Sequence, residues 1–324
     1  MKDMEYPVTG SDRMDQKQCE AIQAVKNKYC DWLMSLNNVH SVAIGYKETD
    51  GKETDEPAII VFTTKKEAKK NCPKNEQVPA YLDGIPTDVI ELPKFETYQA
   101  EQNEVENREK FRPIPGGAEI YMPNSPFTGG LCTLGMFVRS IRAQDNENDI
   151  YLLANAHCFP RPDQSIFQPE SHETQDLIAY ASRTVNSELV DGGIARMLYS
   201  GEAKTNEIIG IGAPLGSYEL TMDNIGDLVI KSGRTTGTTI GKIAYLYADA
   251  DDKRNQIIIA DVNTAFSDHG DSGSVVLMQE GEYRHHVIGL LWGGALNYTI
   301  LSPIFAVCDE LQVSLITSDN NTVS

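Results

Sequence analysis

Apolar side chains recur at helical spacing near the start of the chain. Between residues 15 and 35 they return every three to four positions, with Lys, Gln and Asp between them. This period predicts an amphipathic helix that packs its apolar stripe against a core, rather than one that holds a cofactor. The stripe consists of Cys19, Ile22, Val25, Tyr29, Trp32 and Leu33.

The pattern then changes to that of strands. Residues 39–46 alternate, and a second apolar run covers 58–62, with the turn Asp50-Gly51 between them. Two such runs around an Asp-Gly turn predict a β-hairpin. Residues 87–92 indicate one more strand. Together with the helix, these elements predict a small α+β domain over residues 1–95.

Residues 96–112 have no apolar period and are rich in Glu and Gln, which predicts an acidic linker. From residue 114 onward, short β-type runs alternate with Gly, Pro, Asn and Asp, a pattern typical of barrels or sandwiches. We expect a β domain over residues 113–312, with a short helix at 307–311, and a tail over 313–324. The expected strands are 132–141, 150–154, 177–181, 228–230, 239–247, 256–262, 274–277 and 286–292.

Charge and composition restrict the partners of this chain. The formal net charge of −19 over 324 residues disfavours nucleic acid, whose binding needs a basic surface. The first residues contain no apolar signal segment, and the longest apolar stretch, 287–296, holds three glycines and is too short for a membrane span. We therefore expect a soluble cytoplasmic protein that does not bind membranes.

The cysteines and histidines do not indicate a metal site. The six cysteines include no Cys-x-x-Cys pair, and His285-His286 has no carboxylate at ligand spacing. In a reducing compartment we expect the cysteines to be thiols. No metal and no cofactor is predicted.

One short stretch indicates nucleophilic chemistry. In residues 269–274, His-Gly-Asp-Ser-Gly-Ser, Ser272 stands between two glycines on a turn that leads into an apolar run. Such a turn exposes the serine hydroxyl and lets the N–H groups of Gly270 and Ser272 point at one place, where they would stabilise an oxyanion. The alternative is an ordinary surface turn, since Gly, Asp and Ser are common in turns.

A serine nucleophile needs a base, and the base needs an acid that orients it. His157 follows the predicted strand 150–154, and Asp191 stands before two glycines in a second β-type segment. Taken alone, His157 suits a structural role and Asp191 suits a turn cap. The order His, Asp, Ser, with each residue at a strand end, favours a catalytic triad.

These stretches resemble blocks of the trypsin family. Residues 154–158, 191–195 and 270–274 are similar to the family's histidine, aspartate and serine blocks, while 131–135 and 287–294 are similar to strands beside the site. The resemblance implies two antiparallel six-stranded β-barrels of chymotrypsin type, mainly β, after the small α+β domain. Residues 85–91 and 231–237 resemble blocks of bacterial trypsin-like peptidases that carry an extra N-terminal α+β domain. The plant narrow-leaf-type proteases are similar to this subgroup.

The resemblance also implies roles for single residues. Ser272 would be the nucleophile, His157 the base and Asp191 its orienting acid, with the N–H groups of Gly270 and Ser272 as the oxyanion hole. A phenylalanine at the base of the specificity pocket argues against simple cleavage after Arg or Lys, although Asp268 lies close by in sequence. The implied substrate-binding residues are Phe266, Ser267, His269, Trp292, Gly293 and Gly294.

Two features depart from the family. Cys132 and Cys158 stand where its members often have a disulfide, but without an export signal we expect both to be reduced. Residues 114–117, Ile-Pro-Gly-Gly, resemble the N-terminus that activating cleavage creates, and Asp271 could receive the freed amine. We expect constitutive assembly, with cleavage before Ile114 as the alternative.

These observations predict a regulated intracellular serine endopeptidase that acts on protein substrates. Its N-terminal domain would recognise an activating or regulatory protein, or gate the site. Family resemblance alone suggests a bacterial stress or phage-defence system. The alternatives are a binding or scaffold module that has lost activity, and an esterase that uses the same triad.

Overall fold

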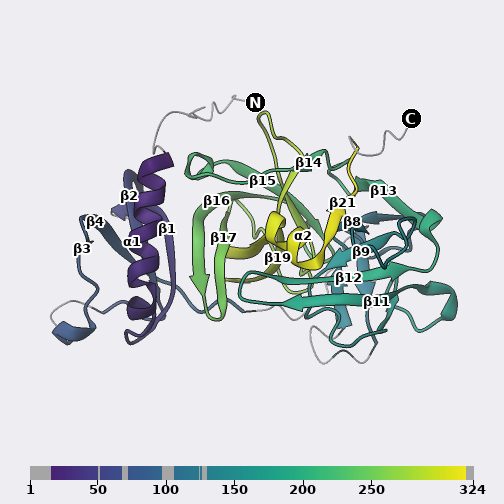
Figure 1. The fold of residues 1–324 in the computed structure, drawn as a ribbon, viewed down its shortest axis with the longest axis horizontal. Helices are drawn as coiled ribbons and strands as arrows, with labels where there is room; N and C mark the ends of the chain where they lie inside the picture. Colours follow the sequence, from purple (N-terminus) through teal and green to yellow (C-terminus); the bar gives the residue numbers. More distant parts are fainter. Residues whose placement is uncertain are drawn as a thin grey trace.

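The computed structural model describes residues 16–49, 52–67, 72–96, 106–123, 125 and 130–318. Three parts lie side by side in Figure 1: an N-terminal unit with a long helix, a central barrel in green, and a second sheet in teal. The N-terminal unit contains α1 (Gln16–Met34), β1 (Val39–Thr49), β2 (Lys52–Thr63), β3 (Tyr81–Leu82) and β4 (Ile85–Glu91). The helix and the predicted strands of this unit are therefore confirmed, whereas the predicted turn Asp50-Gly51 lies outside the described residues.

Helix α1 covers one face of the β1–β2 hairpin through a stripe that includes Ile22 and Leu33. The prediction that Trp32 belongs to the buried stripe is wrong, because its side chain is 39% exposed. Lys26 is buried on the helix instead, at 2% exposure, and its Nζ donates to Asp249 Oδ2 at 2.7 Å. A buried ion pair thus joins the N-terminal helix to the central barrel, and periodicity alone does not reveal it.

The central barrel is a closed ring of six antiparallel strands. They follow the order β15-β18-β19-β20-β17-β16, and pairing of β15 with β16 closes the ring. Strand β1 also pairs with β16, so the sheet of the N-terminal unit continues into the barrel. The barrel strands are β15 (Leu228–Gly233), β16 (Gly237–Ala250), β17 (Lys253–Asp261), β18 (Val275–Met278), β19 (His286–Ala295) and β20 (Tyr298–Pro303).

The second sheet has eight antiparallel strands and curves into a half-barrel, in the order β21-β8-β9-β12-β11-β10-β6-β7. These are β6 (Glu119–Tyr121), β7 (Leu131–Thr133), β8 (Met136–Ser140), β9 (Tyr151–Ala154), β10 (Ser165–Phe167), β11 (Leu177–Asn186), β12 (Asp191–Met197) and β21 (Val313–Leu315). Outside both sheets, β5 (Ile114–Gly116) pairs with β13 (Ala203–Ile208), and β14 (Gly216–Ser217) pairs with β19. The chymotrypsin-type fold class is confirmed, although the second sheet is an eight-stranded half-barrel and not a six-stranded barrel.

Helix α2 (Ile304–Leu311) packs its buried residues Ile304, Val307 and Leu311 against both sheets and begins earlier than the predicted helix at 307–311. The predicted tail starts as a strand, because β21 pairs with β8. Most of the predicted linker lies outside the described residues. Its end packs against the protein, since the buried Asn107 donates to Gly117 O and Ser232 Oγ. Within the described ranges, no helix combines the length and apolar character that a membrane crossing requires.

Candidate active site

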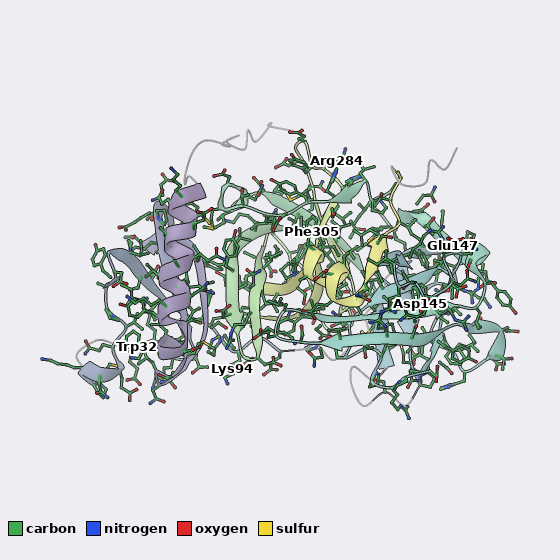
Figure 2. The ribbon with its side chains drawn as sticks, viewed as in Figure 1. Trp32, Lys94, Asp145, Glu147, Arg284 and Phe305 are labelled. Carbon is green, nitrogen blue, oxygen red and sulfur yellow. A yellow bond between two sulfur atoms is a disulfide. The ribbon has the colours of Figure 1, made fainter. Side chains whose placement is uncertain are left out.

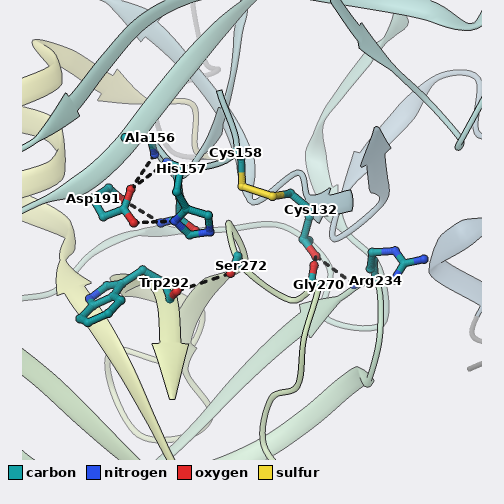
Figure 3. Close-up of a disulfide and its surroundings, with 11 residues drawn as sticks. Cys132, Ala156, His157, Cys158, Asp191, Arg234, Gly270, Ser272 and Trp292 are labelled. Carbon is teal, nitrogen blue, oxygen red and sulfur yellow. Dashed lines mark hydrogen bonds and ion pairs between the residues drawn. A yellow bond between two sulfur atoms is a disulfide. The ribbon is translucent and has the colours of Figure 1, made fainter. Parts of the chain in front are cut away.

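The half-barrel brings the predicted base and acid together. Strand β9 ends three residues before His157, and β12 begins at Asp191. The two strands pair through Gly193 and Ala154, which places both side chains at one edge of the sheet. His157 Nδ1 and Asp191 Oδ2 are 2.6 Å apart, and a dashed line joins the two side chains in Figure 3.

The remaining polar groups of Asp191 are also used. Its Oδ1 accepts from the backbone N–H groups of Ala156 at 2.8 Å and His157 at 3.2 Å. Its backbone N–H donates to Ser302 Oγ, which belongs to the closed barrel. Burial raises the pKa of the Asp191 carboxyl, but the charge and hydrogen bonds of His157 outweigh it, so the pKa lies below its ordinary value. The carboxylate is therefore ionised at neutral pH and sets the orientation of the imidazole.

Ser272 lies on a turn just before β18 of the closed barrel, and its side chain is fully buried. Gly270 and Gly273 flank it with φ of 100° and 96°, a region that favours glycine. A Cβ on Gly273 would lie 2.2 Å from Thr133 O, so the turn also needs glycine for space. The Ser272 hydroxyl donates to Trp292 O at 3.5 Å.

No hydrogen bond joins the side chains of His157 and Ser272 in this structure. His157 Nε2 is buried and has no hydrogen-bond partner among the described residues. The ring faces the serine in Figure 3, where the only dashed line from Ser272 runs to Trp292. Catalytic hydrogen bonds are often long without substrate and tighten in the complex.

The backbone N–H groups of Gly270 and Ser272 point away from the neighbouring carbonyl bonds of the turn. The carbonyl of His269 accepts from Thr235 Oγ1 at 2.6 Å, and the carbonyl of Asp271 accepts from Ser274 N at 3.0 Å. In a trans peptide the N–H points away from the carbonyl, so the N–H groups of Gly270 and Ser272 lie opposite these bonds. Neither N–H donates to another described group, as the predicted oxyanion hole would require.

Asp271 holds this backbone conformation from inside the protein. Its fully buried carboxylate lies 3.1 Å from Lys231 Nζ and accepts from Thr235 N at 2.8 Å and Thr236 Oγ1 at 2.7 Å. Burial lowers the pKa of Lys231, and the Asp271 charge opposes that effect. The block 231–237, noted in the sequence only for its resemblance, thus forms the cradle of Asp271. The sequence feature that could have indicated this cradle is Lys231, a charged residue that directly follows the apolar run at residues 228–230.

This cradle bears on activation by cleavage. Asp271 already has an ammonium partner in Lys231, and Ile114 is fully buried in β5. The structure therefore satisfies Asp271 without a free amine at residue 114.

Thr133 on β7 ties the nucleophile turn to the half-barrel, and sequence reasoning missed it. Its N–H donates to Ser272 O at 2.9 Å, and its Oγ1 donates to Gly270 O at 3.0 Å and accepts from Arg234 N. The expectation that the neighbouring Cys132 is reduced is wrong, because it forms a disulfide with Cys158. The expectation came from the absence of an export signal, whereas the fold brings the two Cα atoms to 6.3 Å, within disulfide range.

The predicted substrate-binding residues fall into two groups. Trp292, Gly293 and Gly294 lie on β19, and of these Trp292 contacts Ser272 through its carbonyl. The Trp292 indole donates to Gln256 Oε1 at 2.9 Å. The ring of Phe266 instead has no exposed surface and lies in the core of the closed barrel.

The other residues before the serine are engaged locally. The hydroxyl of Ser267 pairs with that of Thr299 at 2.6 Å. Asp268 accepts from His269 N through Oδ1 and donates its own N–H to Asp271 Oδ2. The Asp268 side chain therefore supports the turn.

Two family models match parts of this chain, one in its N-terminal unit and one in its C-terminal half. The family model of the NARROW LEAF 1 N-terminal domain matches residues 21–91, and that of the Nal1 C-terminal domain matches residues 197–310. Protein NARROW LEAF 1 of Oryza sativa subsp. japonica is 24% identical over 323 residues, which cover 82% of this chain and 54% of the rice protein. The chain thus spans about half the length of this curated relative. The similarity to narrow-leaf-type proteins inferred from the motifs is confirmed.

Solved structures of serine proteases are similar at low identity. Protease A of Thermobifida fusca is 18% identical with a TM-score of 0.47, covering 63% of this chain and 99% of that chain. A protease of Nocardiopsis is 17% identical with a TM-score of 0.46 and the same coverage. A glutamic-acid-specific serine protease is 18% identical with a TM-score of 0.46, covering 62% of this chain and 99% of its own.

Proposed function

We propose that this protein is a serine endopeptidase whose triad is His157, Asp191 and Ser272. The observation that carries the proposal is the arrangement around His157. Its Nδ1 is held by a buried carboxylate, while its buried Nε2 is left without a partner beside a serine on a glycine turn. An imidazole fixed at one nitrogen and available at the other is what a general base requires.

The reaction follows from these positions. Ser272 Oγ attacks the scissile carbonyl carbon while His157 Nε2 takes the hydroxyl proton, and the N–H groups of Gly270 and Ser272 bind the resulting oxyanion. His157 then gives the proton to the leaving amine, and the acyl group remains on Ser272. Water attacks this ester with His157 again as base, which releases the acid and restores the serine. Asp191 stabilises the imidazolium in both steps.

The edge of β19 supplies a place for the peptide. Pairing between β18 and β19 begins at Val275 and Leu290, so Trp292–Gly294 extend past the start of β18 beside the nucleophile. An extended peptide would add here as an antiparallel strand, through backbone hydrogen bonds that depend little on sequence. The absence of an acidic residue at position 266 disfavours Arg or Lys before the cleaved bond.

Labelling with a fluorophosphonate, read by intact mass beside Ser272→Ala, tests this function. A single adduct on the full-length wild type, absent from the variant, is the expected result because Asp271 is already cradled. An adduct found only on a fragment that begins at Ile114 would establish activation by cleavage. Labelling together with turnover of activated esters, but no cleavage of any protein in a lysate, would favour the esterase alternative. No labelling of either form would favour the scaffold alternative.

A further inference from the structure

The backbone edge that would receive a peptide is already paired with another part of this chain. Glu96 forms an antiparallel bridge with Gly294: the Glu96 N–H donates to Gly294 O, and the Gly294 N–H donates to Glu96 O, both at 3.0 Å. A β-bridge of this kind uses both groups that Gly294 would offer to an added strand. The bridge lies two residues along β19 from Trp292, whose carbonyl accepts from the Ser272 hydroxyl.

The local form of β19 directs these groups toward the nucleophile. Its pairing with β20 shifts register between Leu291 and Gly293, so the alternation of backbone directions is interrupted there. Before the shift, the N–H and C=O of Leu291 bond to Ser274 and Gly273 of the nucleophile turn. After it, the groups of Gly294 are directed to Glu96 on that same side. Because the bridge is antiparallel, the chain direction at Glu96 is opposite to that of β19.

The segment from Leu92 to Glu96 is firmly held. The Leu92 N–H donates to Thr63 O at 2.9 Å, and Leu92 O lies 2.8 Å from His40 Nε2, so both backbone groups are bound to the N-terminal unit. Phe95 is 4% exposed and shares a core cluster with Phe62 and Trp292. Lys94 lies at the junction of the N-terminal unit and the closed barrel in Figure 2, with its Nζ 3.8 Å from Asp251.

We propose that the backbone at Glu96 is an intramolecular competitor of peptide substrates at the edge of β19. The inference rests on the proposed function, because it concerns the regulation of the same site. A peptide must displace the bridge before its own backbone pairs with Gly294, so the fraction of free edge sets the apparent affinity. Modification of Ser272 by a small reagent such as a fluorophosphonate does not need this edge and is insensitive to the bridge. The attachment of Leu92 makes the N-terminal unit the part of the molecule that holds the competitor in place.

Two probes and two variants test the competition in the full chain. A fluorophosphonate reports on the nucleophile alone, and a mixed pool of tetrapeptide phosphonates reports on the nucleophile and the β19 edge together. Glu96→Pro removes the N–H that Gly294 O accepts, whereas Glu96→Ala keeps the backbone and serves as the control. We expect Glu96→Pro to accelerate tetrapeptide labelling about fivefold, in line with one lost hydrogen bond. The fluorophosphonate rate should stay at the wild-type value, and Glu96→Ala should change neither rate.

The outcomes separate this inference from the proposed function. Unchanged or slower tetrapeptide labelling of Glu96→Pro, with normal fluorophosphonate labelling, overturns the competition and leaves the peptidase intact. If the fluorophosphonate does not label Ser272 in any form, the proposed function fails and the competition fails with it.

Hydrogen exchange on the wild type gives a test that needs no variant. Tetrapeptide phosphonate bound at Ser272 should raise the exchange of the Glu96 amide, because the peptide takes its acceptor. Unchanged exchange at Glu96 in the labelled protein would overturn the inference even if Glu96→Pro does not fold.

Discussion

The two halves of the candidate site are held in opposite ways. The acid–base half fixes itself, because Asp191 uses one carboxylate oxygen for His157 Nδ1 and the other for two backbone N–H groups. The nucleophile half is fixed by its surroundings. The hydroxyl of Ser272 has one long contact, while the neighbouring Asp271 is enclosed by Lys231 and by residues 235–236.

The difference follows from what each half must present. A general base needs one side chain in one orientation, and a single carboxylate sets it. An oxyanion hole is a backbone conformation, so it needs many contacts that hold a turn in a region open to glycine. We therefore expect damage to the first half to appear mainly in rate, and damage to the second half in stability as well as rate.

The largest expected effect comes from Asp191→Asn, which breaks the acid–base half. The amide keeps an oxygen for the N–H groups of Ala156 and His157, but it no longer fixes the imidazole tautomer or stabilises its charge. We expect the rate of fluorophosphonate labelling to fall about ten-thousandfold. Asp252→Asn, on a side chain that is 80% exposed, is the control. A loss of less than about tenfold would contradict the role of Asp191.

Lys231→Met should disrupt the nucleophile half and lower the unfolding free energy of the protein. The change leaves the Asp271 carboxylate buried without its cation, which costs about 3–5 kcal/mol of unfolding free energy. Urea denaturation followed by circular dichroism measures it.

Two further variants serve as controls. Lys204→Met removes an exposed lysine paired with Glu207 and should change stability by about 0.5 kcal/mol or less. Adding Asp271→Asn to Lys231→Met should restore part of the loss, since no charge is then left unpaired. Equal stability of Lys231→Met and wild type would show that the ammonium is not needed.

The disulfide links the segment of His157 to β7, whose Thr133 contacts the nucleophile turn, because Cys158 follows His157 and Cys132 precedes Thr133. Replacing both cysteines by alanine should lower the unfolding free energy by about 3.5 kcal/mol, the effect expected for a loop of this length. The bridge spans a sequence separation of 26. Cys72→Ala, at a half-buried free thiol, is the control. If a reductant destabilises the wild type no more than the double variant, the disulfide is not present in solution.

Sequence patterns predicted the parts of this molecule that have local signatures. A glycine-flanked serine, a histidine after an apolar strand and the period of α1 are each visible within a few residues. Strand β20 was missed because the polar residues at its ends obscure the apolar alternation. Trp32 was assigned to the wrong face because periodicity locates a stripe and not its edges.

The missed site residues depend on contacts between distant segments. Lys231 is 40 positions from Asp271, and Thr133 is 137 positions from Gly270. Each belongs to a strand that carries no sign of its partner. The bridge from Glu96 to Gly294 uses backbone atoms alone, so no side chain could indicate it. Residues that present the chemistry were visible in the sequence, whereas the contacts that hold the backbone were not.

Thr133→Val should have the smallest effect and tests the contact between the halves most directly. Valine keeps the shape and the backbone N–H to Ser272 O but loses the hydroxyl, which leaves Gly270 O and Arg234 N buried without it. Because the Gly270 peptide then loses one constraint, we expect fluorophosphonate labelling to slow about tenfold. Thr238→Val, which removes an exposed hydroxyl bonded to Ile209 O, should leave the rate unchanged. An unchanged rate for Thr133→Val would mean that the Asp271 cradle alone holds the oxyanion hole, so that the two halves are independent.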